Sequence, residues 1–177
     1  MLKIGDKAID FSLPGTDGRI YTLSSFVIAK AIAIIFTCNH CPYAQSYQDR
    51  IIALQKDYEQ KSLRIVAINP NDDENYPEDS FDAMIGRAKE KKYNFPYLRD
   101  ETQEIAEAYG AEVTPDVFLF DQKKIMRYRG RIDDNWRDPQ KVKSHDLKNA
   151  IDAVLSGKEP PVKEARAVGC SIKWKDD

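Results

Sequence analysis

The chain has 177 residues, which is long enough to bury a sizeable core within one domain. Hydrophobic residues make up 42% and charged residues 32% of the sequence, the proportions of an ordinary globular protein. The 27 basic and 29 acidic residues leave a formal net charge of −2, which argues against nucleic acid or an anionic membrane surface as a partner.

Apolar stretches and cysteines bear on the compartment in which the protein works. The N-terminal segment has no apolar core of signal-peptide length, and the longest uncharged apolar stretch, residues 31–36, is too short to span a bilayer. The three cysteines, Cys38, Cys41 and Cys170, form an odd and sparse set that does not suit a disulfide framework. We therefore expect a cytoplasmic protein with one working thiol pair and one extra thiol.

The predicted elements begin with a β-hairpin over residues 8–23. Apolar side chains alternate with polar ones up to Leu13, and residues 14–18 are dense in turn-forming types. The apolar run at 31–36 follows and shows no alternation. We therefore expect a central strand of a covered sheet, buried on both faces.

A long helix is predicted from about residue 42 to residue 60. Apolar residues recur there every three or four positions and make one stripe. Pro42 favours the first helical position because its missing N–H costs nothing there. On that interpretation Cys41 caps the helix, although a start at Cys38, with Pro42 inside the first turn, is also compatible with the sequence.

The next strand is predicted at 63–68, so that strand, helix and strand imply a right-handed βαβ unit with a parallel pair. The acidic segment 69–79 comes after it and lacks the glycine of a calcium-binding loop. We therefore expect a solvated loop that leads into a helix starting near Ser80.

The remaining elements follow from capping, turn and periodicity signals. They are an extended piece at 95–98, a short helix between Thr102 and Gly110, a strand at 113–120, its antiparallel partner at 125–132 and a helix at 144–156. We find no internal repeat, low-complexity tract or domain boundary.

A redox hypothesis rests on the segment Phe36–Pro42, where the buried strand becomes a helix. Cys38 and Cys41 are separated by two residues, so one helical turn brings their sulfur atoms within bonding range. A thiolate is the attacking species in disulfide exchange, and the N-terminal end of a helix stabilises a thiolate. We predict that Cys38 attacks a substrate disulfide and that Cys41 resolves the mixed disulfide, which leaves the pair oxidised.

The order of elements, with the cysteine pair after the first core strand, resembles the thioredoxin superfamily. The segment Phe11–Gly18 and the insertion before Ser80 are more similar to its redoxin branch, which holds peroxiredoxin-type proteins and thiol reductases related to cytochrome-maturation factors. The tail Gly169–Trp174 resembles that of bacterial redoxin-domain proteins described as thioredoxin-like. The resemblance implies a thioredoxin-like α/β fold, with a central mixed sheet, helices on both faces and an added N-terminal β-hairpin. Residues 1–177 would form one redoxin domain, with 160–177 as a tail packed on it.

The resemblance also implies roles for Thr114 and Pro115. In the superfamily the matching proline follows a cis peptide bond and packs beside the cysteine pair, and the residue before it offers backbone hydrogen bonds to an extended substrate. The expected partners are a protein or small-molecule disulfide and a thiol electron donor, with no cofactor and no metal. The sequence leaves the substrate, the donor, the direction of electron flow and the oligomeric state open.

Two departures from the superfamily pattern concern the pair itself. The usual Trp-Cys-Gly-Pro-Cys is replaced, with Thr37 before the pair and Asn39-His40 inside it. Peroxiredoxins carry a Thr three residues before the peroxidatic Cys, and relative to Cys41 that position is Cys38. The peroxiredoxin motif is therefore replaced by a dithiol motif.

His40 is expected to tune the pair, because its position resembles that in the Cys-Pro-His-Cys of periplasmic oxidases. If the histidine and the helix lower the pKa of Cys38 by about 2, the thiolate gains roughly 2.7 kcal/mol. For a two-electron couple this corresponds to a potential on the order of 60 mV more oxidising. We therefore predict a reduction potential above that of thioredoxin.

Other interpretations of these residues stay open at this stage. The first alternative is a thiol peroxidase that consumes peroxide through one sulfenic acid, and the second is a non-catalytic binding module that keeps the fold alone. A zinc site needs about four ligands, and the pair would have to recruit Cys170, His40 or His145. Cys170 is expected to be either a buried small hydrophobe or a third redox thiol, and His145 a surface residue.

Overall fold

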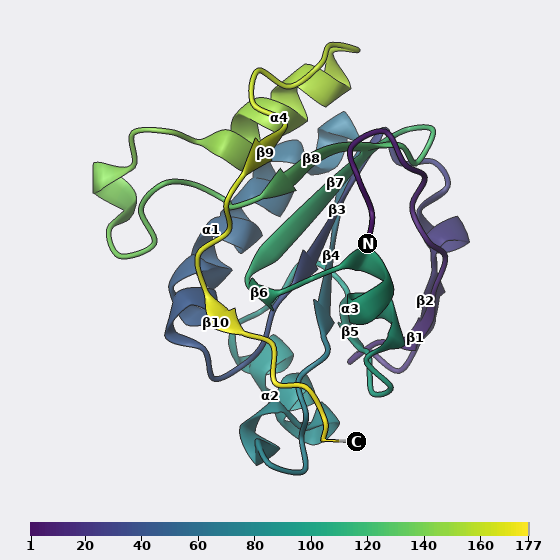
Figure 1. Cartoon of the computed structure of the whole chain (residues 1–177), viewed down its shortest axis with the longest axis vertical. Coiled ribbons are helices and arrows are strands. Elements are labelled where there is room, and N and C mark those ends of the chain that lie inside the picture. Colours follow the sequence, from purple (N-terminus) through teal and green to yellow (C-terminus); the bar gives the residue numbers. More distant parts are fainter. Residues whose placement is uncertain (177) are drawn as a thin grey trace.

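A six-stranded sheet with the strand order β5-β4-β3-β7-β8-β9 runs through the middle of the molecule (Figure 1). The computed structural model describes residues 1–176, so Asp177, the last residue of the expected tail, lies outside the described residues. The strands of this sheet are β3 (Ala31–Phe36), β4 (Leu63–Asn69), β5 (Tyr97–Arg99), β7 (Asp116–Asp121), β8 (Met126–Gly130) and β9 (Glu164–Ala165). Because β3 pairs in parallel with β4 and antiparallel with β7, the sheet is mixed, as expected.

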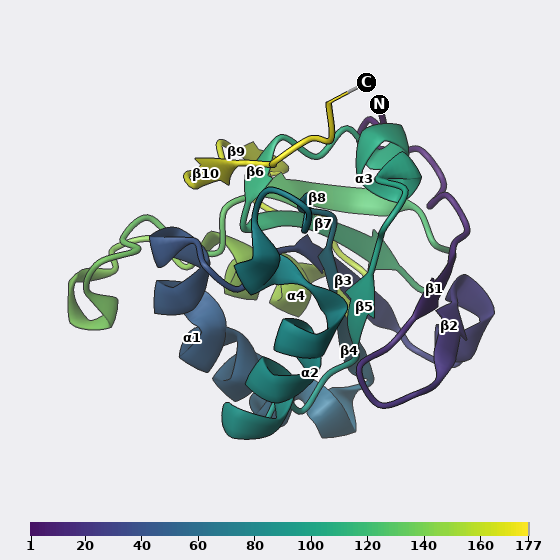
Figure 2. The same ribbon diagram turned by 90° about the horizontal axis from the view of Figure 1, so that it is seen from below.

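Helices cover both faces of the sheet, which confirms the predicted fold class. The helices are α1 (Pro42–Tyr58), α2 (Phe81–Glu90), α3 (Glu104–Tyr109) and α4 (Asp146–Leu155). Figure 2 shows α1, α2 and α4 on one side of the sheet and α3 on the other, together with the N-terminal segment. None of the helices in residues 1–176 is both long enough and apolar enough to cross a membrane.

The central strand β3 explains why its sequence shows no alternation. Ala31, Ala33 and Ile35 pack into the core under α1, α2 and α4, and the residues between them pack into the core on the α3 side. All six residues of β3 have no exposed surface. A strand covered on both faces needs apolar side chains at every position, and β3 has them.

The expected N-terminal hairpin is present and shorter than predicted. Its strands are β1 (Ser12–Pro14) and β2 (Ile20–Thr22), which pair antiparallel. Phe11 and Leu13 are buried and join the core on the α3 side, so the hairpin is part of the hydrophobic core on that face.

Helix starts agree with the sequence at two places and differ at a third. Cys41 is the N-cap of α1, with Pro42 as the first helical residue, and Ser80 caps α2 by accepting a hydrogen bond from the amide of Ala83. The short helix predicted between Thr102 and Gly110 begins one residue later than a cap at Thr102 would give, and the Thr102 hydroxyl accepts a 3.5 Å hydrogen bond from the amide of Glu104. The N-cap of α3 is Gln103 in the left-handed conformation, with φ of 65°.

The segment from Asn69 to Asp79 is the expected solvated loop only in part, because Glu74, Asn75 and Glu78 are exposed and other polar residues are not. Asn69, Asn71 and Asp79 are almost fully buried, with exposures of 0%, 1% and 0%. These polar side chains bond to one another and to the residues around the cysteine pair, as described below. Burial of polar groups is tolerated where each finds a hydrogen-bond partner, and these groups find partners both in the segment itself and at Asn39.

A second small sheet joins two segments that lie far apart in the sequence. It consists of β6 (Val113–Thr114) and β10 (Cys170–Ser171), which pair antiparallel. The C-terminal tail therefore runs across the molecule from β9 and returns to the vicinity of the cysteine pair (Figure 1).

Candidate active site

The two thiols of the predicted pair lie at the end of β3 and the start of α1. Cys38 follows the strand and is 3% exposed, whereas Cys41 is the helix cap and is completely buried. Their side chains contact each other through a hydrogen bond, so the pair is placed to form a disulfide. Both are free thiols in this structure.

Thr114 contacts both members of the pair. Its hydroxyl oxygen lies 3.3 Å from Sγ of Cys38, and its carbonyl oxygen accepts a hydrogen bond of 3.4 Å from the Cys41 thiol. The peptide bond between Thr114 and Pro115 is cis, as the resemblance implied. The fold therefore brings the two halves of the predicted site together across more than 70 residues of sequence.

In the reduced pair the contact between the thiols acts in opposite directions on the two pKa values, and loss of the Cys41 proton would remove the hydrogen bond that Cys41 donates to Thr114. The hydrogen bond from Cys38, followed by one from Cys170 and one from the amide of Ala44, holds the pKa of Cys41 well below that of an ordinary thiol. The same contact with Cys41, together with burial and the negative charge of Asp79, raises the pKa of Cys38. The sequence-based prediction placed the thiolate on Cys38, whereas these directions favour Cys41, which caps α1 at its positive end.

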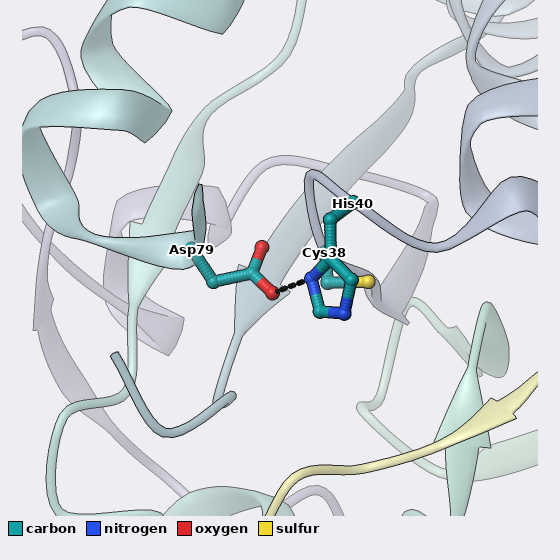
Figure 3. Close-up of side chains that lie close together, drawn as sticks. All are labelled: Cys38, His40 and Asp79. Carbon is teal, nitrogen blue, oxygen red and sulfur yellow. Dashed lines mark hydrogen bonds and ion pairs between the residues drawn. The ribbon is translucent and has the colours of Figure 1, made fainter. Parts of the chain in front are cut away.

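His40 is held by a carboxylate that the sequence did not indicate. The ring nitrogen Nδ1 of His40 bonds to Oδ2 of Asp79, and the imidazole lies next to the Cys38 side chain (Figure 3). The ring is also stacked on Tyr76, with centroids 5.6 Å apart. The histidine is therefore positioned from two sides, beside a thiol whose pKa is raised in part by the charge of Asp79.

Asp79 is fully buried and its two oxygen atoms are satisfied by protein groups. Oδ1 accepts a 2.6 Å hydrogen bond from the amide of Asn39 and a 3.2 Å bond from Nδ2 of Asn69. Oδ2 accepts a 3.0 Å bond from Nδ2 of Asn71 and also bonds to His40. The same carboxylate lies close enough to the thiols to raise the pKa of Cys38.

Asn39, the other residue inside the motif, ties the pair to the same buried segment. Its Oδ1 accepts a 2.7 Å hydrogen bond from the hydroxyl of Tyr97, and its Nδ2 donates to the carbonyl of Glu78 at 2.9 Å. The departure of Asn39-His40 from the superfamily pattern therefore has a structural reason. Both residues bind the segment that precedes α2.

Sequence reasoning missed Asp79 because the residue appeared only as an acidic start to a helix. A stronger signal is the accumulation of three amide side chains, Asn69, Asn71 and Asn75, in front of the carboxylate. Two of these, Asn69 and Asn71, are the donors to Asp79. Local sequence carries no information on their burial, since that depends on the packing of β4 and α2.

Within residues 1–176, one set of side chains has the proximity of metal ligands. The set is Cys38, His40 and Asp79, whose ligand atoms lie within 4.8 Å of one another. The histidine nitrogen that faces the set is bonded to Asp79, and Asp79 accepts three further hydrogen bonds. His145, the other histidine, is the exposed N-cap of α4.

Cys170 joins the pair through the small sheet. It lies opposite Thr114 in the β6–β10 pairing and packs against the cluster formed by Cys38, Cys41 and Ala44. The backbone edge of Thr114, which was expected to receive an extended substrate, is thus paired with the chain's own tail.

A dithiol at the end of a central strand, next to a cis-proline on the thioredoxin-like fold, defines a redoxin-type protein. A profile of the AhpC/TSA family matches residues 4–129. The chain belongs to the AhpC/TSA family, within the redoxin branch of the thioredoxin superfamily.

Three relatives illustrate how close the similarity is. "Thiol-disulfide oxidoreductase ResA" of Halalkalibacterium halodurans is 22% identical over 122 residues, which cover 69% of this chain and 65% of that protein. The match therefore spans less than two thirds of the curated relative. An uncharacterized conserved protein from Geobacillus kaustophilus has 42% identity and a TM-score of 0.94, covering 100% of this chain and 95% of that chain. A hypothetical protein from Sinorhizobium meliloti 1021 has 36% identity and a TM-score of 0.94, covering 100% and 97%.

Proposed function

We propose that the protein is a thiol-disulfide oxidoreductase that works through the dithiol pair of Cys38 and Cys41. The observation that carries the proposal is the contact between these two thiols at the junction of β3 and α1, beside Thr114. Membership of the AhpC/TSA family supports oxidoreductase chemistry in general. The substrate would be a protein or small-molecule disulfide, and an external thiol would restore the reduced pair.

The reaction starts when Cys38 attacks one sulfur of the substrate disulfide. Cys38 is the less enclosed member of the pair. It passes its proton to the Cys41 thiolate and forms a mixed disulfide with one substrate sulfur. The other substrate sulfur leaves as a thiolate and then takes the proton from Cys41. Cys41 then attacks the sulfur of Cys38, the second substrate thiolate leaves, and the pair becomes a disulfide. The substrate disulfide is reduced by two electrons and the protein dithiol is oxidised by two.

Thr114 and Pro115 would position an extended substrate beside the pair. The backbone edge at Thr114 is paired with β10, so a substrate strand can add to that edge only after the tail has moved aside. A small disulfide needs no such pairing. We therefore expect small disulfides to react in the closed arrangement and protein disulfides to require displacement of the tail.

The test is reduction of insulin disulfides with an added dithiol reductant, using wild type, Cys38→Ser and Cys41→Ser. Both variants should lose at least about 100-fold in rate, because a nucleophile or its resolving partner is missing. The Cys41→Ser variant should accumulate a mixed disulfide on Cys38, detectable by mass spectrometry of the trapped complex. Unchanged reduction by Cys38→Ser would exclude the proposal.

A thiol peroxidase is the second candidate, favoured by the lowered pKa of Cys41. In that reaction the Cys41 thiolate attacks peroxide, becomes a sulfenic acid, and condenses with a neighbouring thiol to give a disulfide and water. Peroxide-dependent oxidation of the added reductant, abolished in Cys41→Ser, would favour this function. Reduction of insulin without consumption of peroxide would favour the first.

A further inference from the structure

The C-terminal tail delivers a third thiol to the cysteine pair. β10 lies antiparallel to β6, with Cys170 opposite Thr114 and Ser171 opposite Val113. Thr114 is the residue that contacts both Cys38 and Cys41. The register of this short pairing therefore sets the position of Cys170 relative to the two thiols.

The tail is fixed on both sides of Cys170. Gly169 passes so close to β6 that a Cβ atom there would lie 2.1 Å from the carbonyl oxygen of Thr114. Ile172 is 3% exposed and packs into the core on the α3 side. The amide of Lys173 donates to Oδ1 of Asn71 at 3.0 Å. A thiol held by this many contacts is an ordered part of the site.

The three thiols lie together around Cys41. Cys38 and Cys41 belong to one buried cluster, Cys170 packs against that cluster, and both neighbours lower the pKa of Cys41. Cys41 is completely buried and Cys38 nearly so, whereas Cys170 is only half-buried. Cys170 is thus the most accessible of the three sulfur atoms and touches the least accessible.

We propose that Cys170 is a third redox thiol, which exchanges with the Cys38–Cys41 disulfide to form an alternative disulfide between Cys41 and Cys170. The inference rests on the proposed function, because that reaction supplies the first disulfide. Cys170 attacks the sulfur of Cys41, the Cys41–Cys170 bond forms, and the Cys38–Cys41 bond breaks. Cys170 gives its proton to solvent and the released Cys38 thiolate takes one up. The step is an isomerisation, so it consumes no oxidant.

The exchange carries the disulfide from a buried position to a half-buried one. An external thiol can then attack the sulfur of Cys170, form a mixed disulfide and release Cys41. A second external thiol reduces that mixed disulfide and restores the free Cys170. In this scheme substrate enters at Cys38 and the electron donor acts at Cys170, so the two partners do not compete for one sulfur atom.

The test maps disulfides in wild type and in single Cys→Ser variants after equilibration with reduced and oxidised glutathione. Free thiols are blocked, and the linked peptides are identified by mass spectrometry. Cys38→Ser should form the Cys41–Cys170 disulfide, Cys170→Ser should form the Cys38–Cys41 disulfide, and wild type should contain both. A Cys38→Ser protein with Cys41 and Cys170 free or linked only to glutathione would overturn the inference.

Gly169→Ala supplies a matched control that leaves all three thiols in place. The added methyl group collides with Thr114 and should shift β10. The yield of the Cys41–Cys170 disulfide should then fall at least about 10-fold relative to wild type. The Cys38–Cys41 disulfide should persist. Equal yields of Cys41–Cys170 disulfide in Gly169→Ala and wild type would contradict the role of the pairing. Circular dichroism establishes that each variant is folded.

Failure of this inference is distinguishable from failure of the proposed function. If Cys170→Ser forms the Cys38–Cys41 disulfide but Cys38→Ser forms none, the dithiol function stands and the third thiol is excluded. If Cys170→Ser forms no Cys38–Cys41 disulfide, the dithiol function itself fails.

Discussion

Asp79 bonds to Nδ1 of His40 and holds the imidazole beside the thiol of Cys38 (Figure 3). The carboxylate is completely buried, so its charge acts on Cys38 through protein rather than through water. The sequence-based expectation considered His40 without a carboxylate partner. In the structure the imidazole bonds to Asp79, so the effect on the thiols depends on both side chains.

This balance predicts opposite changes in reduction potential for two variants. His40→Ala leaves the negative charge of Asp79 uncompensated near the thiols, which disfavours the thiolate and should lower the potential by about 30 mV. Asp79→Asn removes that charge and should raise the potential by a similar amount. Redox titration against glutathione, followed by thiol trapping, measures both values.

Glu78→Gln is the matched control for these titrations. Glu78 is an exposed neighbour of Asp79 and carries the same charge, so its removal should leave the potential unchanged within a few mV. Shifts of the same sign in His40→Ala and Asp79→Asn would contradict the charge balance. A wild-type potential at or below that of thioredoxin would remove His40 from the tuning of the pair.

The pKa directions of the three cysteines predict how many thiolates the reduced protein carries at neutral pH. Hydrogen bonds lower the pKa of Cys41, the shared contact raises that of Cys38, and burial raises the pKa of Cys170 to about 11. The reduced protein should therefore carry one thiolate at pH 7, on Cys41. The ultraviolet absorbance of thiolates, followed during a pH titration, measures how many are present at each pH.

Variants assign that thiolate to one residue. Cys41→Ser should abolish the absorbance at pH 7, and Cys170→Ala should retain it with a modest rise in the apparent pKa, because one donor to Cys41 is lost. A thiolate signal that survives in Cys41→Ser and disappears in Cys38→Ser would reverse the assignment.

The hydrogen bonds of Asp79 predict a large contribution to stability. Asp79→Ala leaves buried donors of Asn39, Asn69 and Asn71 without an acceptor, which should cost about 3 kcal/mol in the free energy of unfolding. Urea denaturation of the reduced protein measures this. The exposed neighbour provides the comparison, since Glu78→Ala should change stability by less than about 0.5 kcal/mol. Equal stability of the two variants would show that the network contributes little.

Asp116 predicts a pH dependence of stability near the site. Burial raises its pKa to about 6, against the pull of Arg129, whose Nη2 lies 3.6 Å from the carboxylate. The folded protein therefore binds this proton more tightly than the unfolded chain, where an aspartate titrates near about 3.9. The contribution of Asp116 to the free energy of unfolding is fully present below about pH 4. It is lost as the pH rises to 6, and the loss is about 3 kcal/mol at most.

Asp116→Asn isolates this effect. The variant should be more stable than wild type at pH 7 by up to about 2 kcal/mol, because it avoids burying a charge and loses only a weak ion pair. The difference between the two proteins should shrink as the pH falls from 6 to 4. Urea denaturation across this range measures it, and a difference that does not depend on pH would contradict the prediction.

Local signals in the sequence were sufficient for most of the architecture. The unbroken apolar run of β3 predicted a strand covered on both faces, and Pro42 predicted the start of α1 with Cys41 as its cap. That Thr114–Pro115 lies beside the cysteine pair was implied by the resemblance to the thioredoxin superfamily, and the two segments do meet in the fold. Such signals work because helix caps, turns and strand burial depend on residues a few positions apart.

Only the tertiary structure decided what surrounds the thiols. Asp79 reaches the motif across some 40 residues, and the tail that carries Cys170 pairs with β6 from the far end of the chain. The segment 69–79 has the composition of a solvated loop, yet Asn69, Asn71 and Asp79 are buried within it because they satisfy one another. Contacts of this kind leave no periodic pattern in the sequence, since each depends on the packing of elements that are distant along the chain. The sequence by itself therefore determined that there is a thiol pair on a redoxin fold, and the packing determined which charge and which third thiol lie beside it.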